Sequence, residues 1–158
     1  MKILFVYPDI NVRGGAQSYQ FGIGMLSAML KRHGHETRLH YMYGKYNPCS
    51  LKSAIAAYKP NILTFSAVSP QYQYVQQIFR DLQPFEAFTI LGGCHPTLAP
   101  ECLGQISGLN AICVGEGEYP MLELTNALRD GKSTENIPNL WVKRKDGSIV
   151  KNHTRAFT

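Results

Sequence analysis

The chain has 158 residues, 44% of them hydrophobic and 17% charged, which is the size and composition of one globular domain. Its apolar runs are as long as strands, far short of the roughly 20 residues of a membrane helix. Met1-Lys2 leads directly into such a run, without the segments of a secretory signal. We therefore expect a cytoplasmic protein with no membrane-spanning segment.

The net charge of +5 is concentrated near the carboxyl end. Residues 132 to 158 carry six Lys or Arg against two acidic residues, which leaves the first 131 residues almost neutral. Such a basic tail is typical of a solvated segment or a docking surface, and no aromatic-rich basic motif accompanies it. We expect no nucleic-acid partner.

The four cysteines do not indicate a metal site. None of them forms a Cys-x-x-Cys pair, so their spacing predicts neither a zinc site nor an iron–sulfur site. The expected buried or incidental thiols are Cys49, Cys94, Cys102 and Cys113.

Strand and helix patterns alternate along the first 131 residues. The predicted elements, in chain order, are a strand at 3–7, a helix at 18–33, a strand at 36–41, a helix at 50–58, a strand at 62–66, a helix at 72–82, a strand at 87–91, a short helix at 97–105, a strand at 111–114 and a helix at 119–129. These five βα units predict an α/β fold: a doubly wound, five-stranded parallel sheet of flavodoxin-like order 2-1-3-4-5, with helices on both faces.

The end of the chain departs from this repeat. "LWVKRKDGSIVKN" consists of two strand-like runs around Asp146-Gly147, a strong signal for a two-residue β-hairpin turn. We therefore divide the chain into a Rossmann-like domain at 1–131 and a segment at 132–158 that holds the hairpin and the start of a linker.

Four of the five predicted strands end in unusual loops. Their sequences are "PDINVRGG", "SAVSPQ", "GGCHP" and "GEGEYP". Turn chemistry would explain one glycine-rich loop, but four at the edge where open parallel sheets bind ligands favour a ligand site. The usual nucleotide motifs are absent, because Pro120 takes the third glycine position of a dinucleotide fingerprint and no phosphate-binding Gly-x-x-x-x-Gly-Lys-Ser/Thr run exists.

Several of these loops resemble one family. "DINVRG" is similar to the Asp-x-His-x-x-Gly loop of cobalamin-binding domains, with Asn11 in place of the cobalt-ligating histidine. "GGCHPTLAPE" and "VGEGEYPMLEL" resemble the amino-terminal cobalamin-binding domains of cobalamin-dependent radical S-adenosylmethionine enzymes. "IPNLWVKRKDGSIVKN" resembles the segment that joins this domain to the catalytic barrel, so the resemblance covers nearly the whole chain.

The resemblance implies a cofactor and a set of site residues. The cofactor is cobalamin, bound with its dimethylbenzimidazole base off the cobalt and with no histidine beneath it, because Asn11 is a poor cobalt ligand. Bulky loops would block the cofactor's nucleotide tail, whereas glycines leave room for it. We predict no metal-ligating and no catalytic residue in this chain. The expected cofactor-binding residues are Asp9, Asn11, Arg13, Gly14, Gly15, Ser66, Val68, Ser69, Gly92, Gly93, His95, Gly115, Glu116 and Gly117.

The catalytic half implied by the resemblance lies elsewhere. The chain lacks the Cys-x-x-x-Cys-x-x-Cys motif that binds the iron–sulfur cluster, so either it is a fragment or another polypeptide supplies that half. The hairpin and basic tail stop without a closing element, which favours a fragment. The expected partner is the chain's own downstream radical domain, with the cluster and S-adenosylmethionine. Methyl transfer is the favoured overall reaction, and ring formation or another radical rearrangement stays open.

The sequence leaves two alternatives open. His95 fits a hydrogen bond that orders its loop and a contact to the ligand equally well. Residues 1 to 40 also resemble the first half of a retaining glycosyltransferase that uses a nucleotide sugar. That interpretation gives no account of "GGCHPTLAPE" or "GEGEYP".

Overall fold

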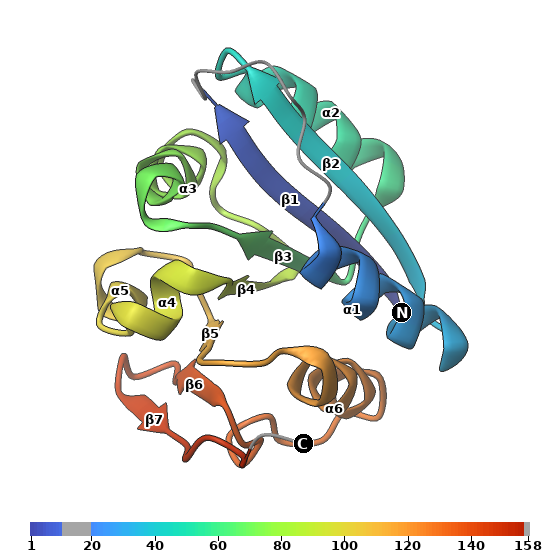
Figure 1. Cartoon of the computed structure of the whole chain (residues 1–158), viewed down its shortest axis with the longest axis vertical. Helices are drawn as coiled ribbons and strands as arrows, with labels where there is room; N and C mark the ends of the chain where they lie inside the picture. The colour runs from blue at the N-terminus through green and yellow to red at the C-terminus, as the bar shows by residue number, and fades with distance from the viewer. Residues whose placement is uncertain (11–19, 157–158) are drawn as a thin grey trace.

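The strands form one sheet in the order β2-β1-β3-β4-β5-β6-β7 in the computed structural model, which describes residues 1–10 and 20–156 (Figure 1). Its parallel strands are β1 (Lys2–Ile10), β2 (Glu36–Gly44), β3 (Ile62–Ser66), β4 (Phe88–Gly92) and β5 (Ala111–Cys113). The predicted parallel sheet and its order 2-1-3-4-5 are confirmed.

The predicted hairpin is also present, and it extends the same sheet. β6 (Leu140–Lys143) pairs antiparallel with β5, Trp141 lying opposite Ile112, and β7 (Ile149–Lys151) pairs with β6. Gly147 has a φ of +85° at the turn, a conformation that favours glycine. The hairpin therefore covers the edge of β5 that the parallel strands leave open.

Helices cover both faces of the sheet (Figure 1). On one face, α1 (Phe21–Arg32) packs against α6 (Glu118–Arg129), and their apolar side chains meet Ile3 and Phe5 of β1. The other face carries α2 (Pro48–Tyr58), α3 (Ser69–Leu82) and α5 (Cys102–Gln105) over a second core. The five-residue α4 (Cys94–Leu98) follows β4 at the carboxyl edge. No helix among the described residues combines the length and apolar character needed to cross a bilayer.

The single helix predicted at 97–105 is wrong. Two short helices, α4 and α5, occupy this region, and Ala99 between them has the non-helical backbone angles φ −135° and ψ 65°. Pro100 explains the break, because proline disfavours helical geometry in the residue before it and donates no backbone hydrogen bond.

β1 is longer than predicted and rises beyond its neighbour β3. Its pairing with β3 ends at Val6 and Phe65, whereas its pairing with β2 continues to Ile10 and Gly44. The extra residues of β1 and β2 form a two-stranded ribbon that stands above the carboxyl ends of the other strands, on one side of the expected ligand site (Figure 1).

Candidate functional site

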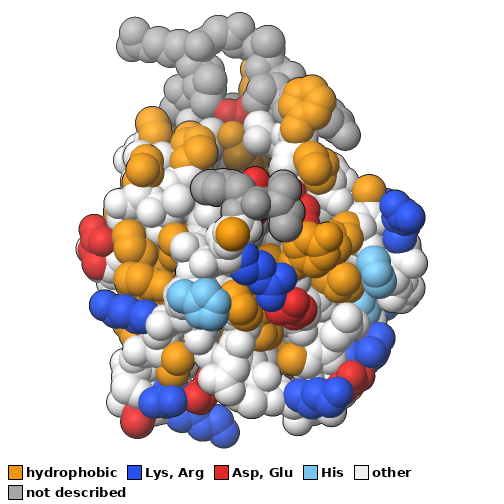
Figure 2. All heavy atoms as spheres, turned by 60° about the horizontal axis from the view of Figure 1, so that its bottom comes forward, with side chains coloured by type: hydrophobic (Ala, Val, Ile, Leu, Met, Phe, Trp, Pro, Cys, Tyr) orange, Lys and Arg blue, Asp and Glu red, His pale blue; other side chains and the backbone are white. Residues whose placement is uncertain are grey.

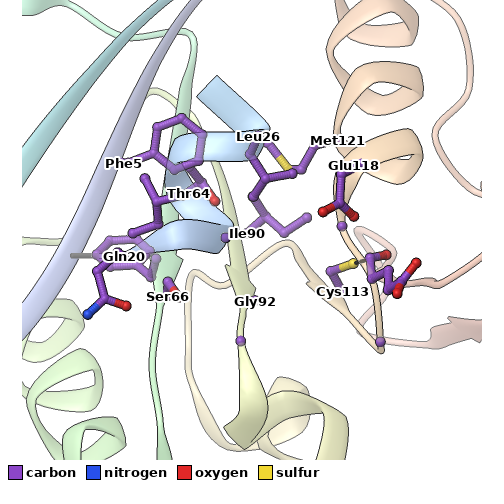
Figure 3. A pocket seen from close by; sticks show the side chains of 17 residues that line it. Phe5, Gln20, Leu26, Thr64, Ser66, Ile90, Gly92, Cys113, Glu118 and Met121 are labelled. Carbon is purple, nitrogen blue, oxygen red and sulfur yellow. Dashed lines mark hydrogen bonds between the residues drawn. The ribbon is translucent and has the colours of Figure 1, made fainter. Parts of the chain in front are cut away.

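A cavity of about 240 Å³ lies between the carboxyl half of the sheet and helices α1 and α6. Figure 3 shows Leu26 of α1, Met121 of α6 and Ile90 of β4 gathered along its apolar wall. Ser66 and Glu118 add polar groups to its lining. An apolar hollow with a few polar groups is the usual form of a small-molecule site.

Predicted site residues from three loops meet at this cavity. Those that line it are Ser66, Gly92, Gly93, Gly115, Glu116 and Gly117. They end or follow β3, β4 and β5, so the three carboxyl ends converge on one hollow, as expected for ligand sites of open parallel sheets.

Glycine is required in this lining. Gly93 has a φ of +97°, and a Cβ atom there would lie 2.8 Å from the carbonyl oxygen of Ala67. In contrast, Gly22 in α1 also lines the cavity, and a Cβ atom built on it meets no heavy atom within 4 Å. Gly93 therefore keeps two loops in close contact, while Gly22 leaves open space beside α1.

The open space continues beneath α1. A second hollow of about 490 Å³ lies between α1 and β2. It shares Phe5, Gln20 and Ile23 with the first. The two hollows adjoin, so the slot under this helix is longer than the cavity alone.

Backbone hydrogen bonds connect the loops after β3 and β4. The Ala67 N–H donates to the Gly92 carbonyl, and the His95 N–H donates to the Ala67 carbonyl, each over 3.1 Å. The loops at 66–69 and 92–95 therefore act as one rim of the cavity.

His95 is held against α3. Its ring stacks on Tyr72 with centroids 3.9 Å apart, and its Nδ1 lies 3.1 Å from the Ser69 hydroxyl. Burial lowers the pKa of His95, against a smaller opposite effect of Glu101, so the imidazole is neutral at pH 7. The hydrogen bond that orders the loop is thus present. Exposed Val68 lies on the same rim.

Asp9 lies on β1 rather than in a loop. Its side chain is only 4% exposed and accepts hydrogen bonds from the Tyr41 hydroxyl and from Gln71 Nε2, the latter over 3.2 Å. The carboxylate is thus already held by two donors of its own chain. The other residues predicted from this loop, Asn11, Arg13, Gly14 and Gly15, lie outside the described residues.

Cys113 places a thiol in the cavity wall. Burial, with a smaller contribution from Glu118, raises its pKa to about 12, so the thiol stays protonated. It points to the Glu116 carbonyl at 3.6 Å. This cysteine is a packing residue, as expected from the sequence. In the described part of the chain, no group of three or more His, Cys, Asp or Glu could hold a metal ion.

Two of the basic residues near the carboxyl end are paired with acidic ones at close range. Arg155 contacts Glu123 at 2.6 Å and Arg144 contacts Glu135 at 2.8 Å. Figure 2 shows Lys and Arg scattered among acidic side chains on this side of the molecule, without a continuous basic patch. This arrangement agrees with a solvated or docking surface.

Sequence reasoning missed much of the cavity wall. Most of the missed residues are apolar and repeat at ordinary core spacing, so no pattern separates a cavity lining from a filled core: Phe5, Ile23, Leu26, Phe65, Ile90 and Met121. Gly22 is the lining residue that the sequence could have indicated. Glycine lowers helix stability, so a glycine inside a helix suggests that space is needed there.

Three comparisons bear on this geometry. The chain is 28% identical to the anaerobic magnesium-protoporphyrin IX monomethyl ester cyclase of Rubrivivax gelatinosus, over 95% of this chain and 29% of that protein. Its fold matches the cobalamin-dependent S-adenosylmethionine radical enzyme OxsB with a TM-score of 0.83 at 18% identity, over 99% of this chain and 22% of OxsB. It matches the radical S-adenosylmethionine methyltransferase TsrM of Kitasatospora setae with a TM-score of 0.77 at 18% identity, over 99% of this chain and 29% of TsrM.

The chain thus spans less than a third of each of these proteins. A family model for the B12-binding domain matches residues 9–125, most of the parallel sheet and all three loops that line the cavity. This match favours cobalamin over the nucleotide-sugar alternative, which rested on residues 1 to 40. With its carboxyl-edge loops gathered around one hollow, the chain belongs to the B12-binding domain family.

Proposed function

We propose that the chain holds cobalamin with the nucleotide tail in the cavity beneath α1 and the corrin ring over the loops after β3, β4 and β5. The observation that carries this proposal is the slot under α1, which Gly22 leaves open and which Gly92 and Gly93 border. Its apolar wall suits a planar base, and the Ser66 hydroxyl suits the polar groups of the tail.

The chain's own residues would bind and orient the cofactor. Cobalamin would supply the methyl-transfer or electron chemistry when bound. Exposed Val68 offers an apolar contact for the ring, and the stacked pair of His95 and Tyr72 holds the adjoining rim in place. The glycines after β4 and β5 allow the backbone to approach the ligand closely.

We also propose base-off binding without a histidine beneath the cobalt. Asn11 stands at the sequence position of that histidine, and an amide is a weaker ligand for such metals than imidazole. Two neighbouring side chains are already engaged within the chain: Asp9 by Tyr41 and Gln71, and His95 by Tyr72 and Ser69. This supports a lower face without a protein ligand.

For the whole protein we propose a radical S-adenosylmethionine enzyme that transfers a methyl group. The downstream domain would hold the iron–sulfur cluster and S-adenosylmethionine and would cover the rim. The large apolar side chains exposed around the site support such a cover: Phe21, Met25, Val68, Leu98 and Tyr119. TsrM, which matches over 99% of this chain, is a methyltransferase of this kind.

Ring formation is the second candidate reaction. The relative from Rubrivivax gelatinosus, 28% identical to this chain, is a cyclase. In either case the substrate would be selected mainly outside these 158 residues. Sequencing the remainder of the gene tests this part of the proposal, because a Cys-x-x-x-Cys-x-x-Cys motif is expected there.

Cobalamin uptake is tested directly with the 158-residue chain. After incubation with aquacobalamin and gel filtration, corrin absorbance is expected to co-elute with the protein at about one cofactor per chain. The spectrum should be that of cobalamin with its base off the cobalt. Protein that elutes without corrin absorbance would contradict the proposed function.

A further inference from the structure

Two glycine turns at the mouth of the cavity are hydrogen-bonded to one hydroxyl group. The Thr97 hydroxyl donates to the Gly93 carbonyl over 3.1 Å and accepts the Gly115 N–H over 3.0 Å. Gly93 follows β4 and Gly115 follows β5, and both line the cavity. One side chain of α4 thus connects two loops from different strands.

This connection lies beyond the end of the sheet. The last ladder pair between β4 and β5 joins Leu91 to Ile112, so the backbones separate before they reach the two glycines. The Thr97 hydroxyl bridges the gap at the point where the cavity opens. The hydroxyl has a single hydrogen, which it donates to the Gly93 carbonyl, so it has no further hydrogen to donate.

Both turns need glycine, because each has a backbone conformation that other residues rarely adopt. Gly93 has a φ of +97° and Gly115 a φ of +84°. A Cβ atom on Gly115 would lie 3.3 Å from Asn139 Nδ2, and one on Gly93 would lie even closer to Ala67. The Thr97 hydroxyl is the group that bonds directly to both of these turns.

We propose that Thr97 is a positioning residue that fixes the width of the cavity mouth and so determines how tightly the nucleotide tail of a corrinoid is bound. The inference rests on the proposed cobalamin site, but Thr97 does not itself line the cavity. It acts through Gly93 and Gly115. Its contribution should therefore depend on whether the ligand carries a tail.

The test compares two corrinoids and two variants of the chain. Cobinamide has the corrin ring but lacks the nucleotide tail of cobalamin. Thr97→Val keeps the side-chain shape without the hydroxyl, and Thr97→Ser keeps the hydroxyl. We expect Thr97→Val to weaken cobalamin binding about tenfold, the scale of one lost hydrogen bond, with cobinamide changed less than about twofold. Thr97→Ser should restore cobalamin affinity.

A second measurement follows the bridge without any ligand. The Gly115 amide hydrogen should exchange faster with solvent in Thr97→Val than in wild type or Thr97→Ser. An equal loss of affinity for both corrinoids, or no loss for either, would overturn the inference while leaving the proposed function intact. Wild-type protein that binds neither corrinoid would contradict the proposed function and this inference with it.

Discussion

The imidazole of His95 lies over the ring of Tyr72, with 3.9 Å between centroids and 20° between planes. This contact and the hydrogen bond with Ser69 hold the imidazole against α3. We therefore predict that His95 is not a ligand of the bound cobalt. Electron paramagnetic resonance of the cobalt(II) form should lack nitrogen splitting from an axial ligand, in wild type and in His95→Ala alike. Splitting that disappears in His95→Ala would reverse the assignment.

Filling the slot beneath α1 should weaken cobalamin binding without lowering the stability of the fold. Gly22→Leu adds a side chain to the cavity lining and replaces glycine in the first turn of α1 with a better helix former. We expect unchanged or increased resistance to urea and at least a tenfold loss of cobalamin affinity. Gly104→Leu is the matched control, because Gly104 also lies in a helix with open space and lines no part of the cavity.

Gly92→Leu tests the same cavity from the sheet. Gly92 lines the cavity, and a Cβ atom on it would meet only Cys113 Cβ among the described residues, at 4.0 Å, so an added side chain has room in the hollow. Cobalamin affinity should fall strongly, whereas the free energy of unfolding should change little. Equal cobalamin affinity in wild type, Gly22→Leu and Gly92→Leu would show that the tail lies elsewhere.

Thiol labelling should report the position of the ring. Cys94 on the rim and Cys49 on α2 are exposed, whereas Cys102 and Cys113 are buried. Burial raises the pKa of Cys102 to about 11 and that of Cys113 to about 12, so these two should react slowly with iodoacetamide. Cobalamin is expected to slow modification of Cys94 and to leave Cys49 unchanged, as read by peptide mass spectrometry. Unchanged labelling of Cys94 would place the ring away from α4.

The stability of the apo protein should fall on acidification. His35 is 4% exposed, its Nε2 lies 3.1 Å from Asn126 Oδ1, and no described residue bonds its buried Nδ1. Burial lowers the pKa of His35 from 6.5, against a smaller opposite effect of the Asn126 bond. A depressed folded-state pKa means that protons bind the unfolded chain more tightly, so stability is lost as the pH falls below about 6.5.

The variant His35→Gln isolates this contribution. Urea unfolding at pH 7.5 and pH 5.5 should show a smaller loss of stability in His35→Gln than in wild type. His40 and His95 have pKa values shifted in the same direction, so part of the loss should remain. The exposed His33 provides the control: His33→Gln should keep most of the wild-type pH dependence, because His33 contributes only the smallest of the effects on the pKa of His35.

The sheet could be predicted because each short apolar run alternates with a helical pattern, and local sequence carries both signals. The end of β1 could not be predicted, because Pro8 and Asp9 favour turns and their pairing with β2 keeps them in a strand. The sequence therefore predicts a loop at Asp9, whereas tertiary contacts bury this residue beside Tyr41 and Gln71.

The loops of the site were predictable from their glycines, but the connection between them was not. The sequence predicts only a helix at Thr97, because nothing in its sequence neighbourhood shows that its hydroxyl reaches the turn after β5. A bond between segments 18 residues apart depends on the distance between strand ends, which is a property of the folded sheet.

The hairpin at the end of the sheet has a consequence for cooperativity. β5 is three residues long, and β6 contributes three of its ladder pairs against two from β4. Asn139 adds hydrogen bonds in both directions with Val114, at the root of the loop that carries Gly115. Local opening of the hairpin would therefore release one wall of the ligand site, so the amides of β5 and β6 should exchange with solvent as a single unit.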